Sequence, residues 1–505
     1  MNNSRTKKFM YNSMTTALQQ LIVMIAGFIT PRFMLVYYGS EMNGLVSSIT
    51  QFITYFNLVE AGLAGAAVYS LYKPLAMNDH EGISGVVSAA KHFYNISGCI
   101  FAGLIGILAI FYPIFVQSAL SPWLVAILVV VLGAKSFLDF FTLSKYRVLL
   151  TADQKVYVVS LASSIYTILN TIVIVVLSML RVNIVILYVA AILPLASRSV
   201  ILHFYVKKHY PYVNYRAKRN DAALSKRWDA LFLQILQSVQ TGAPTVIATI
   251  FTSLKTVSVY SVFNMVLTGI NGLLSIFQSG LSASFGDIIA RKEVKTLQKA
   301  YNEFEFAYYN IIFFVYAVAG AMLQSFVNIY THNVTDTNYN QPLLALLFVI
   351  NGLLYNVKTP QGMLVISAGH YKETRWRSLT QALIAVIAGA ALAPIWGLNG
   401  IMVGLILSNL YRDIDLFFYV PKYITSLSPF VTITRVLRML AAAVLICLPS
   451  IFLNIAPKNY LEWVLYALGF AVYGGIILLL QSLIFERRQL SGVMQRLKGM
   501  LHKSK

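Results

Sequence analysis

Long apolar runs recur along the whole chain, and short polar segments separate each run from the next. A helix that crosses the hydrocarbon core of a bilayer needs about 20 predominantly apolar residues, since each residue adds about 1.5 Å. Windows of this length predict an all-α integral membrane protein with about fourteen transmembrane helices. The predicted spans lie at 12–38, 42–71, 92–116, 121–145, 155–180, 183–207, 229–254, 256–288, 299–328, 341–368, 377–394, 397–419, 435–453 and 461–484.

The basic residues test this map independently of hydropathy. Most of the 39 Lys and Arg residues fall in every second loop and in both terminal segments, whereas Arg181, Lys255 and Lys458 fall in the other loops. Loops rich in Lys and Arg stay on the cytoplasmic side of a membrane. The pattern therefore predicts that both termini are cytoplasmic. It also explains the net charge of +21 as a topology feature, so that no nucleic acid partner is expected.

Composition narrows the classes of protein further. The chain is 58% hydrophobic and only 11% charged, less than half of the roughly 25% charge of soluble proteins. A soluble enzyme with one membrane anchor is excluded. Cys99 and Cys447 lie in apolar runs without a second ligand at metal-binding spacing, so we expect neither a disulfide framework nor a metal site. No phosphate-binding loop motif occurs, which predicts transport without nucleotide hydrolysis and without a cofactor.

Two parts of the sequence share an irregular pattern. Residues 60–66 (EAGLAGA) and 278–284 (QSGLSAS) both run polar, small, Gly, Leu and three small residues, in the second and eighth spans. The first and seventh spans also each contain a proline, Pro31 and Pro244, which we expect to act as hinges. Matched irregularities predict two six-helix lobes related by a pseudo-two-fold axis along the membrane normal. The predicted division is an N-terminal lobe at 1–207, a basic cytoplasmic linker at 208–228, a C-terminal lobe at 229–420, an extra helix pair at 421–484 and a basic cytoplasmic tail at 485–505.

Several ionisable side chains fall inside the predicted spans, where each costs about 2.5–3.5 kcal/mol on insertion scales. They are Arg32, Glu60, Lys135, Asp139, Arg198 and Lys358. In one interpretation these charges only pair with one another for structural reasons. Lys135 would pair with Asp139 on one helix face, and Arg32 would pair with Glu60 on the next span. A functional interpretation is that Arg32, beside a proline, lines a water-filled opening.

The surplus of cations among these residues favours an anionic ligand such as a phosphate or diphosphate. Arg198 and Lys358 lie near cytoplasmic ends, where long basic side chains can reach the interface. These two, together with Gln278, are second-tier cavity candidates.

The chain as a whole, and above all residues 30–76, resembles the polysaccharide transporter branch of the multidrug/oligosaccharidyl-lipid/polysaccharide (MOP) exporter superfamily, the Wzx-type flippases of O-antigen, capsule and teichoic-type glycans. The shared features are Thr-Pro followed by a basic residue in the first span, Tyr-Gly after it, and Glu-x-Gly-Leu in the second. The resemblance implies that Arg32 binds the diphosphate of the cargo and that Glu60 positions it or couples it to an ion. From their charge inside the fourth span, Lys135 is a further candidate for diphosphate binding and Asp139 for coupling or positioning. Gln278 departs from a symmetric charge pattern. The last two spans resemble those of fourteen-span lipid II flippases, in which the extra pair is linked to a lipid-tail groove, so lipid II stays open as a cargo.

We therefore expect a transporter rather than an enzyme: a flippase that moves an undecaprenyl-diphosphate-linked oligosaccharide from the inner to the outer leaflet of a bacterial cytoplasmic membrane by alternating access. A proton or sodium gradient is the expected drive. The expected partners are the lipid-linked glycan, membrane lipids, and the polymerase and glycosyltransferases of the same pathway.

Two alternatives stay open. A cation-coupled multidrug antiporter would need acidic cavity residues, for which Glu60 and Asp139 are available. A polytopic polymerase or glycosyltransferase would need an outer catalytic loop with paired carboxylates. The D-x-D at Asp413 and Asp415 does not supply one, because we interpret these residues as ordinary charges at the cytoplasmic end of a helix.

Overall fold

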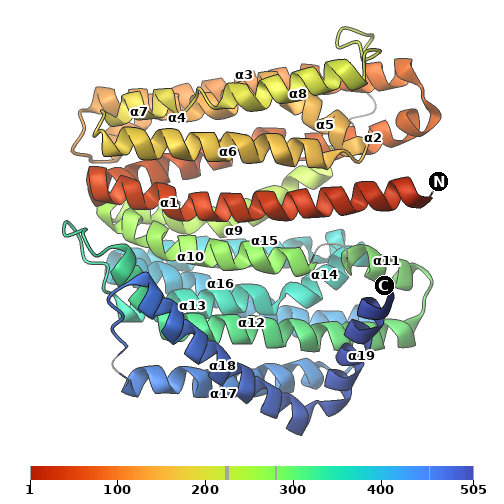
Figure 1. The fold of residues 1–505 in the computed structure, drawn as a ribbon, viewed down its shortest axis with the longest axis vertical. Helices are drawn as coiled ribbons and strands as arrows, with labels where there is room; N and C mark the ends of the chain where they lie inside the picture. Colours follow the sequence, from red (N-terminus) through yellow and green to blue (C-terminus); the bar gives the residue numbers. More distant parts are fainter. Residues whose placement is uncertain (1, 222–226, 279–280, 454, 504–505) are drawn as a thin grey trace. The chain divides into compact units, whose positions relative to one another are not determined.

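The computed structural model describes residues 2–221, 227–278, 281–453 and 455–503, and Figure 1 traces their helices. Within these residues the regular structure is entirely helical, as the apolar periodicity predicts. The chain forms two compact units, Met1–Ser261 and Val262–Lys505. The lobe boundaries expected from the sequence stay a prediction.

The first unit is built from α1 to α9 and the start of α10. Its elements are α1 (Asn2–Phe56), the 3₁₀ turn η1 (Asn57–Glu60), α2 (Leu63–Met77), α3 (His80–Phe115), α4 (Pro122–Thr142), α5 (Ser144–Ala152), α6 (Val156–Met179), α7 (Ile184–Ala190), α8 (Leu195–His209), α9 (Arg227–Phe251) and α10 (Leu254–Gln278).

The second unit contains the rest of α10 and the helices that follow. These are α11 (Leu281–Ala290), α12 (Val294–Tyr330), α13 (Pro342–Val357), α14 (Thr359–Ser367), α15 (Tyr371–Trp396), α16 (Leu398–Val420), the π-helical turn η3 (Pro421–Thr425), α17 (Pro429–Phe452), α18 (Tyr460–Phe485) and α19 (Arg487–Lys503).

Eleven helical segments in the described part of the chain are long and apolar enough to cross a membrane. The first of them, Met10–Met77, contains the predicted spans one and two, and α9 and α16 cover spans seven and twelve without being among the eleven. Many large apolar side chains remain exposed, such as Ile110, Phe115 and Trp123, as expected for helices solvated by lipid. The chain is a multi-pass membrane protein, and the number fourteen stays a prediction.

The break between the first two predicted spans lies at one glycine. Gly39 has φ 81° and ψ 174° inside α1, a conformation that glycine adopts without the steric cost a Cβ atom would bring. The helix α1 is therefore two helices joined at Gly39. The helix runs through the expected hinge Pro31 and departs from helical dihedral angles only at Gly39. Pro244 lies buried inside α9, and the hinge roles of both prolines stay a prediction.

The first copy of the repeated pattern coincides with a helix boundary. In the first unit η1 ends at Glu60, and α2 begins at Leu63 after Gly62, whose φ is 80°. In the second copy, residues 279–280 lie outside the described residues. Discontinuous helices at equivalent places in two halves are typical of transporter binding sites, because they free backbone groups at membrane depth, and a matching discontinuity in the second copy stays a prediction.

The predicted basic linker packs on the first unit. Tyr210 donates a hydrogen bond to Asp153, Asn214 donates its backbone N–H to Ser84 Oγ at 3.1 Å, and Ser88 Oγ donates to the Ala217 carbonyl at 2.9 Å. Burial raises the pKa of the Tyr210 hydroxyl well above its ordinary value, and the hydrogen bond to the Asp153 carboxylate raises it further. These contacts fix the start of the linker against α3 and the loop after α5.

Candidate functional site

A charged cluster lies among α4, α6 and α8 of the first unit. Asp139 of α4 forms an ion pair with Arg198 of α8, and the Arg198 guanidinium carbon lies 5.4 Å from the ring centroid of Tyr166 in α6. The Lys135 ammonium lies 4.9 Å from the same ring. Two cations therefore share the face of one buried tyrosine, whose ring electrons attract them.

This arrangement differs from the pairings considered from the sequence. Asp139 accepts from Arg198 on another helix, instead of from Lys135 four residues earlier. The Arg198 side chain, which is only 18% exposed, is held in this ion pair. Among the described residues no carboxylate pairs with Lys135. The structure thus brings together three of the residues singled out from the sequence and adds Tyr166, which had no distinguishing sequence feature.

Glu60 lies at the helix break of the first unit and binds a second arginine. Its two carboxylate oxygens accept from Arg147 Nη2 at 3.2 and 3.3 Å. Arg147 belongs to the short helix α5 and had been counted only as a basic residue of an inner loop. Both carboxylates considered for this region, Glu60 and Asp139, are therefore paired with arginines. Arg32 lies half-buried in α1.

In the second unit, Lys358 lies between α13 and α14. Its ammonium donates to Asn409 Oδ1 of α16 at 2.5 Å and lies 4.8 Å from the Tyr355 ring centroid. Asn409 in turn donates to Asn351 Oδ1 at 2.9 Å. Lys358 is held inside the unit and does not extend to the interface. The side chain of Gln278, the other second-unit candidate, is outside the described residues.

The two aspartates of the D-x-D sequence lie in different surroundings. Asp415 accepts from Arg377 and from Arg412, the latter at 2.6 Å, which fits the ordinary ion pairing expected at a helix end. Asp413 does not fit it, because it is only 2% exposed. The interpretation as an ordinary terminal charge is therefore wrong for Asp413. Its place on the buried side of α16, one turn after Asn409, is the feature that sequence reasoning overlooked.

A second buried charge network joins the C-terminal helices to α12. Arg435 of α17 is 1% exposed and forms ion pairs with Glu305 of α12 and, at 2.7 Å, with Glu486 after α18. Arg435 also donates to Asn302 Oδ1 at 2.6 Å. Arg435 is the first residue of the predicted span 435–453, where a basic side chain could stay exposed, but the structure buries it. Its position on the buried stripe of α17 could have indicated this, because Thr432, Arg435, Met439, Ala442 and Ile446 recur at helical spacing.

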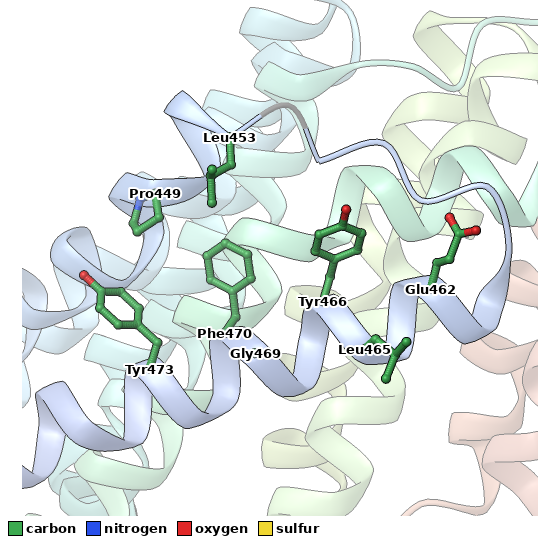
Figure 2. A pocket seen from close by; sticks show the side chains of 8 residues that line it. All are labelled: Pro449, Leu453, Glu462, Leu465, Tyr466, Gly469, Phe470 and Tyr473. Carbon is green, nitrogen blue, oxygen red and sulfur yellow. The ribbon is translucent and has the colours of Figure 1, made fainter.

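Helices α17 and α18 also border an apolar groove, shown in Figure 2. Its volume is about 570 Å³. A Cβ added at Gly469 would meet no atom within 4 Å, so the groove is open beside this residue. The lining residues are Pro449 and Leu453 of α17 and Glu462, Leu465, Tyr466, Gly469, Phe470 and Tyr473 of α18.

The described residues offer no obvious set of metal ligands. In the described ranges no three His, Cys, Asp or Glu side chains gather closely enough to hold a metal ion. Cys99 is exposed and Cys447 is half-buried, and neither forms a disulfide.

Comparison with known proteins identifies the fold. No family model and no curated protein matches the sequence. Solved structures do match. One is an inward-facing multidrug resistance MATE family transporter of the MOP superfamily, with 14% identity, 82% of this chain and 98% of that chain covered, and a TM-score of 0.68. Another is the lipid II flippase MurJ in an inward closed conformation, with 13% identity, 94% and 100% covered, and a TM-score of 0.70. A further match is a MOP superfamily transporter from Pyrococcus furiosus, for which the reverse polarity of the binding pocket suggests a different function, with 14% identity, 83% and 96% covered, and a TM-score of 0.58.

The chain therefore has the fold of MOP superfamily transporters. This confirms the all-α membrane fold expected from the sequence and agrees, in fold, with the resemblance to that superfamily.

Proposed function

We propose that the chain is a flippase that moves a polyprenyl-diphosphate-linked oligosaccharide from the cytoplasmic to the outer leaflet of a bacterial cytoplasmic membrane by alternating access. The observation that carries the proposal is the charge balance of the first unit. Glu60 and Asp139 are each neutralised by an arginine. Lys135, beside the Tyr166 ring, has no carboxylate partner in the described residues and is available to an anion.

The pairing of both first-unit carboxylates with arginines argues against a carrier that binds organic cations in this unit. Such a carrier needs a carboxylate free to bind the cargo, and removing either acid from its arginine would leave a cation unpaired at membrane depth. A diphosphate has the opposite requirement, because its oxygens accept charge-assisted hydrogen bonds from Lys and Arg. We assign Lys135 and Arg32 as the diphosphate ligands. Asp139 acts as a positioning residue that holds Arg198 beside Tyr166, and Glu60 positions Arg147.

The C-terminal helices support a lipid-linked cargo. The 6% of this chain that the MurJ alignment omits is shorter than the segment from Pro429 to the C-terminus, so part of this segment has a counterpart in a lipid II flippase. The groove of Figure 2 is apolar along most of its lining and borders the membrane helices α17 and α18. A polyprenyl chain fits such a groove, since burial of its apolar surface is favourable.

The remaining expectations belong to the same proposal. Both termini lie in the cytoplasm, where glycosyltransferases complete the glycan, and a polymerase consumes it outside. A proton or sodium gradient drives the cycle. The glycan itself, whether of the capsule, O-antigen, teichoic or lipid II type, is for the cargo experiment to identify.

The decisive experiment is transport of a polyprenyl-diphosphate oligosaccharide in proteoliposomes, followed by the accessibility of the sugar to an added lectin. A charge-assisted hydrogen bond contributes about 1.5–3 kcal/mol, so Lys135→Ala is expected to weaken cargo binding by about 10- to 150-fold, while Lys135→Arg retains part of it. Exposed Lys458→Ala is the matched control and should transport normally. Arg32→Ala and Arg32→Lys test the second ligand in the same way.

Mass spectrometry of lipids that co-purify from the native host completes the test. Enrichment of a polyprenyl-diphosphate glycan with the wild type, reduced in Lys135→Ala, supports the proposal and identifies the sugar. Unimpaired transport by Lys135→Ala would refute the phosphate site. Gradient-driven uptake of organic cations without movement of the lipid-linked glycan would favour the antiporter instead.

A further inference from the structure

One buried carboxylate of the second unit has no role in the cargo site described above. Asp413 of α16 is 2% exposed, and neither of its oxygens accepts a hydrogen bond from any group in the described part of the chain. An ionised carboxylate in such surroundings is strongly disfavoured, because it has lost water without gaining donors. It becomes stable by binding a proton or by meeting a cation.

A cation lies near Asp413, but its hydrogen bond goes to an amide and not to this carboxylate. The charge that acts on Asp413 is the Lys358 ammonium. The ammonium donates to Asn409 Oδ1 at 2.5 Å, and Gln381 Nε2 donates to the same oxygen at 3.3 Å. Asn409 precedes Asp413 by one helical turn on the same face of α16. A small displacement of the lysine side chain would therefore exchange an amide partner for a carboxylate partner.

Two other basic groups of α15 and α16 are already paired. Arg377 of α15 and Arg412 of α16 both donate to Asp415. Lys422 of η3, at the end of α16, lies over the Tyr423 ring. None of these basic groups donates to Asp413.

Groups from α12 and α17 complete the surroundings of Asp413. Tyr309 of α12 is close enough to interact with it electrostatically, but its hydroxyl donates to the Val357 carbonyl at 2.9 Å and accepts from Gln361. Arg435 of α17 is occupied by Glu305 and Glu486. Lys358, the cation that acts on Asp413, is therefore hydrogen-bonded to an amide oxygen and to no carboxylate in the described part of the chain.

We propose that Asp413 is a proton-binding site of the transport cycle, with Lys358 as its internal counter-cation. In the protonated state Asp413 is a neutral acid and Lys358 stays on Asn409. When the O–H bond of the acid breaks and the proton leaves to water, the carboxylate forms an ion pair with Lys358. Ionisable groups buried in transporters commonly act as such proton sites.

This assignment moves the coupling role away from Glu60 and Asp139, because both of those carboxylates are already bound to arginines. The assignment rests on the proposed function only in one respect, namely that release and binding of the proton drive movement of the lipid-linked glycan. The protonation itself is a property of the second unit and needs no cargo.

Infrared spectroscopy of the purified full-length chain in lipid nanodiscs tests the protonation directly. A protonated carboxylic acid has a C=O stretch that an ionised carboxylate lacks. Ordinary carboxyl groups ionise at about pH 4, so the scan starts near neutral pH, where exposed acids have already lost this band. We expect the wild type to lose one remaining band as the pH is raised from neutral to alkaline, and Asp413→Asn to lack that band over the same range. Asp415→Asn is the matched control on the same helix, and it should keep the band because Asp415 forms ion pairs with two arginines.

Two further variants keep the test decisive if Asp413→Asn does not fold. Asp413→Glu keeps an acid at the position and should move the band and its titration midpoint. Lys358→Met removes the cation that favours the charged form, so the acid should stay protonated to higher pH. A purely structural Asp413 would show neither shift.

The proposal is overturned if the wild type has no titrating acid band, or if the spectrum of Asp413→Asn keeps it. Cargo transport is measured separately in proteoliposomes. If Asp413 titrates but no lipid-linked glycan moves, the proposed cargo is wrong and the proton site stands. If the glycan moves but Asp413 does not titrate, the proton site is wrong and the proposed cargo stands.

Discussion

Replacement of Arg435 by methionine should destabilise the second unit more than any comparable change at a basic residue of α17. The guanidinium binds the carboxylates of Glu305 and Glu486, and these three side chains are 1%, 1% and 7% exposed. Tyr301 and Thr432 donate further hydrogen bonds to Glu305 at 2.7 and 2.8 Å. Methionine fills much of the same volume but leaves two carboxylates buried without their cation.

The magnitude follows from this burial. Removal of one partner from a buried ion pair costs about 3–5 kcal/mol, because an uncompensated charge remains. For a folding unit of roughly 150–250 residues, each kcal/mol corresponds to about 2–4 °C in the melting temperature. The expected fall for Arg435→Met is therefore roughly 6–20 °C. Neutralising all three positions together, with Glu305→Gln and Glu486→Gln added, should recover much of it, since a neutral buried cluster no longer contains an unpaired charge.

The assay is the melting temperature of the detergent-purified protein, followed by tryptophan fluorescence and by loss of the monodisperse chromatographic peak. Arg438→Met is the matched control, because Arg438 lies one turn further along α17, 4.7 Å from the Phe485 ring centroid. A cation–π contact contributes about 0.5–1 kcal/mol at exposed sites, so this variant should melt within a few degrees of the wild type. Equal melting temperatures for the two variants would refute the reasoning that the buried triad holds α17 and α18 to α12.

Three further outcomes are expected. Gly404→Ala should lower the melting temperature, because its Cβ would lie 2.4 Å from the Gly389 backbone nitrogen and overpacking costs about 1–3 kcal/mol; Gly103→Ala, with no atom within 4 Å, should not. Gly469→Trp should fill the groove of Figure 2 and slow transport of a full-length polyprenyl cargo more than of a short-chain analogue, with Gly103→Trp as control; equal rates for the two cargoes would remove the groove from the transport path. Reporter fusions at each terminus should be active only in the cytoplasm, and an outward C-terminus would contradict the even number of spans.

The sequence by itself determined the class of the protein. Apolar length is a direct requirement of the bilayer, because a helix satisfies its backbone hydrogen bonds within one segment, so runs such as 92–116 predict spans without knowledge of their neighbours. The repeat at residues 60–66 and 278–284 was also visible, and its first copy coincides with a helix that ends and restarts. The MOP fold was indicated by the resemblance of the chain, above all of residues 30–76, to that superfamily.

The partners of the charged residues were decided only by the tertiary structure. Lys135 and Asp139 stand at a favourable helical spacing, yet Asp139 binds Arg198 of α8, and Glu60 binds Arg147. Spacing along one helix gives the possible neighbours on that helix alone, whereas the energy of a buried charge depends on every helix packed around it.

The clearest cases are two residues that the sequence does not distinguish from many other charged residues. Arg435 and Asp413 both stand near predicted cytoplasmic helix ends, where charge is ordinary, but the packing of α12, α16 and α17 buries them. One then becomes the centre of an ion network and the other a carboxylate without donors in the described part of the chain. Hydropathy locates a helix in the membrane, but only the packed structure determines which of its polar side chains are removed from water and what they meet there.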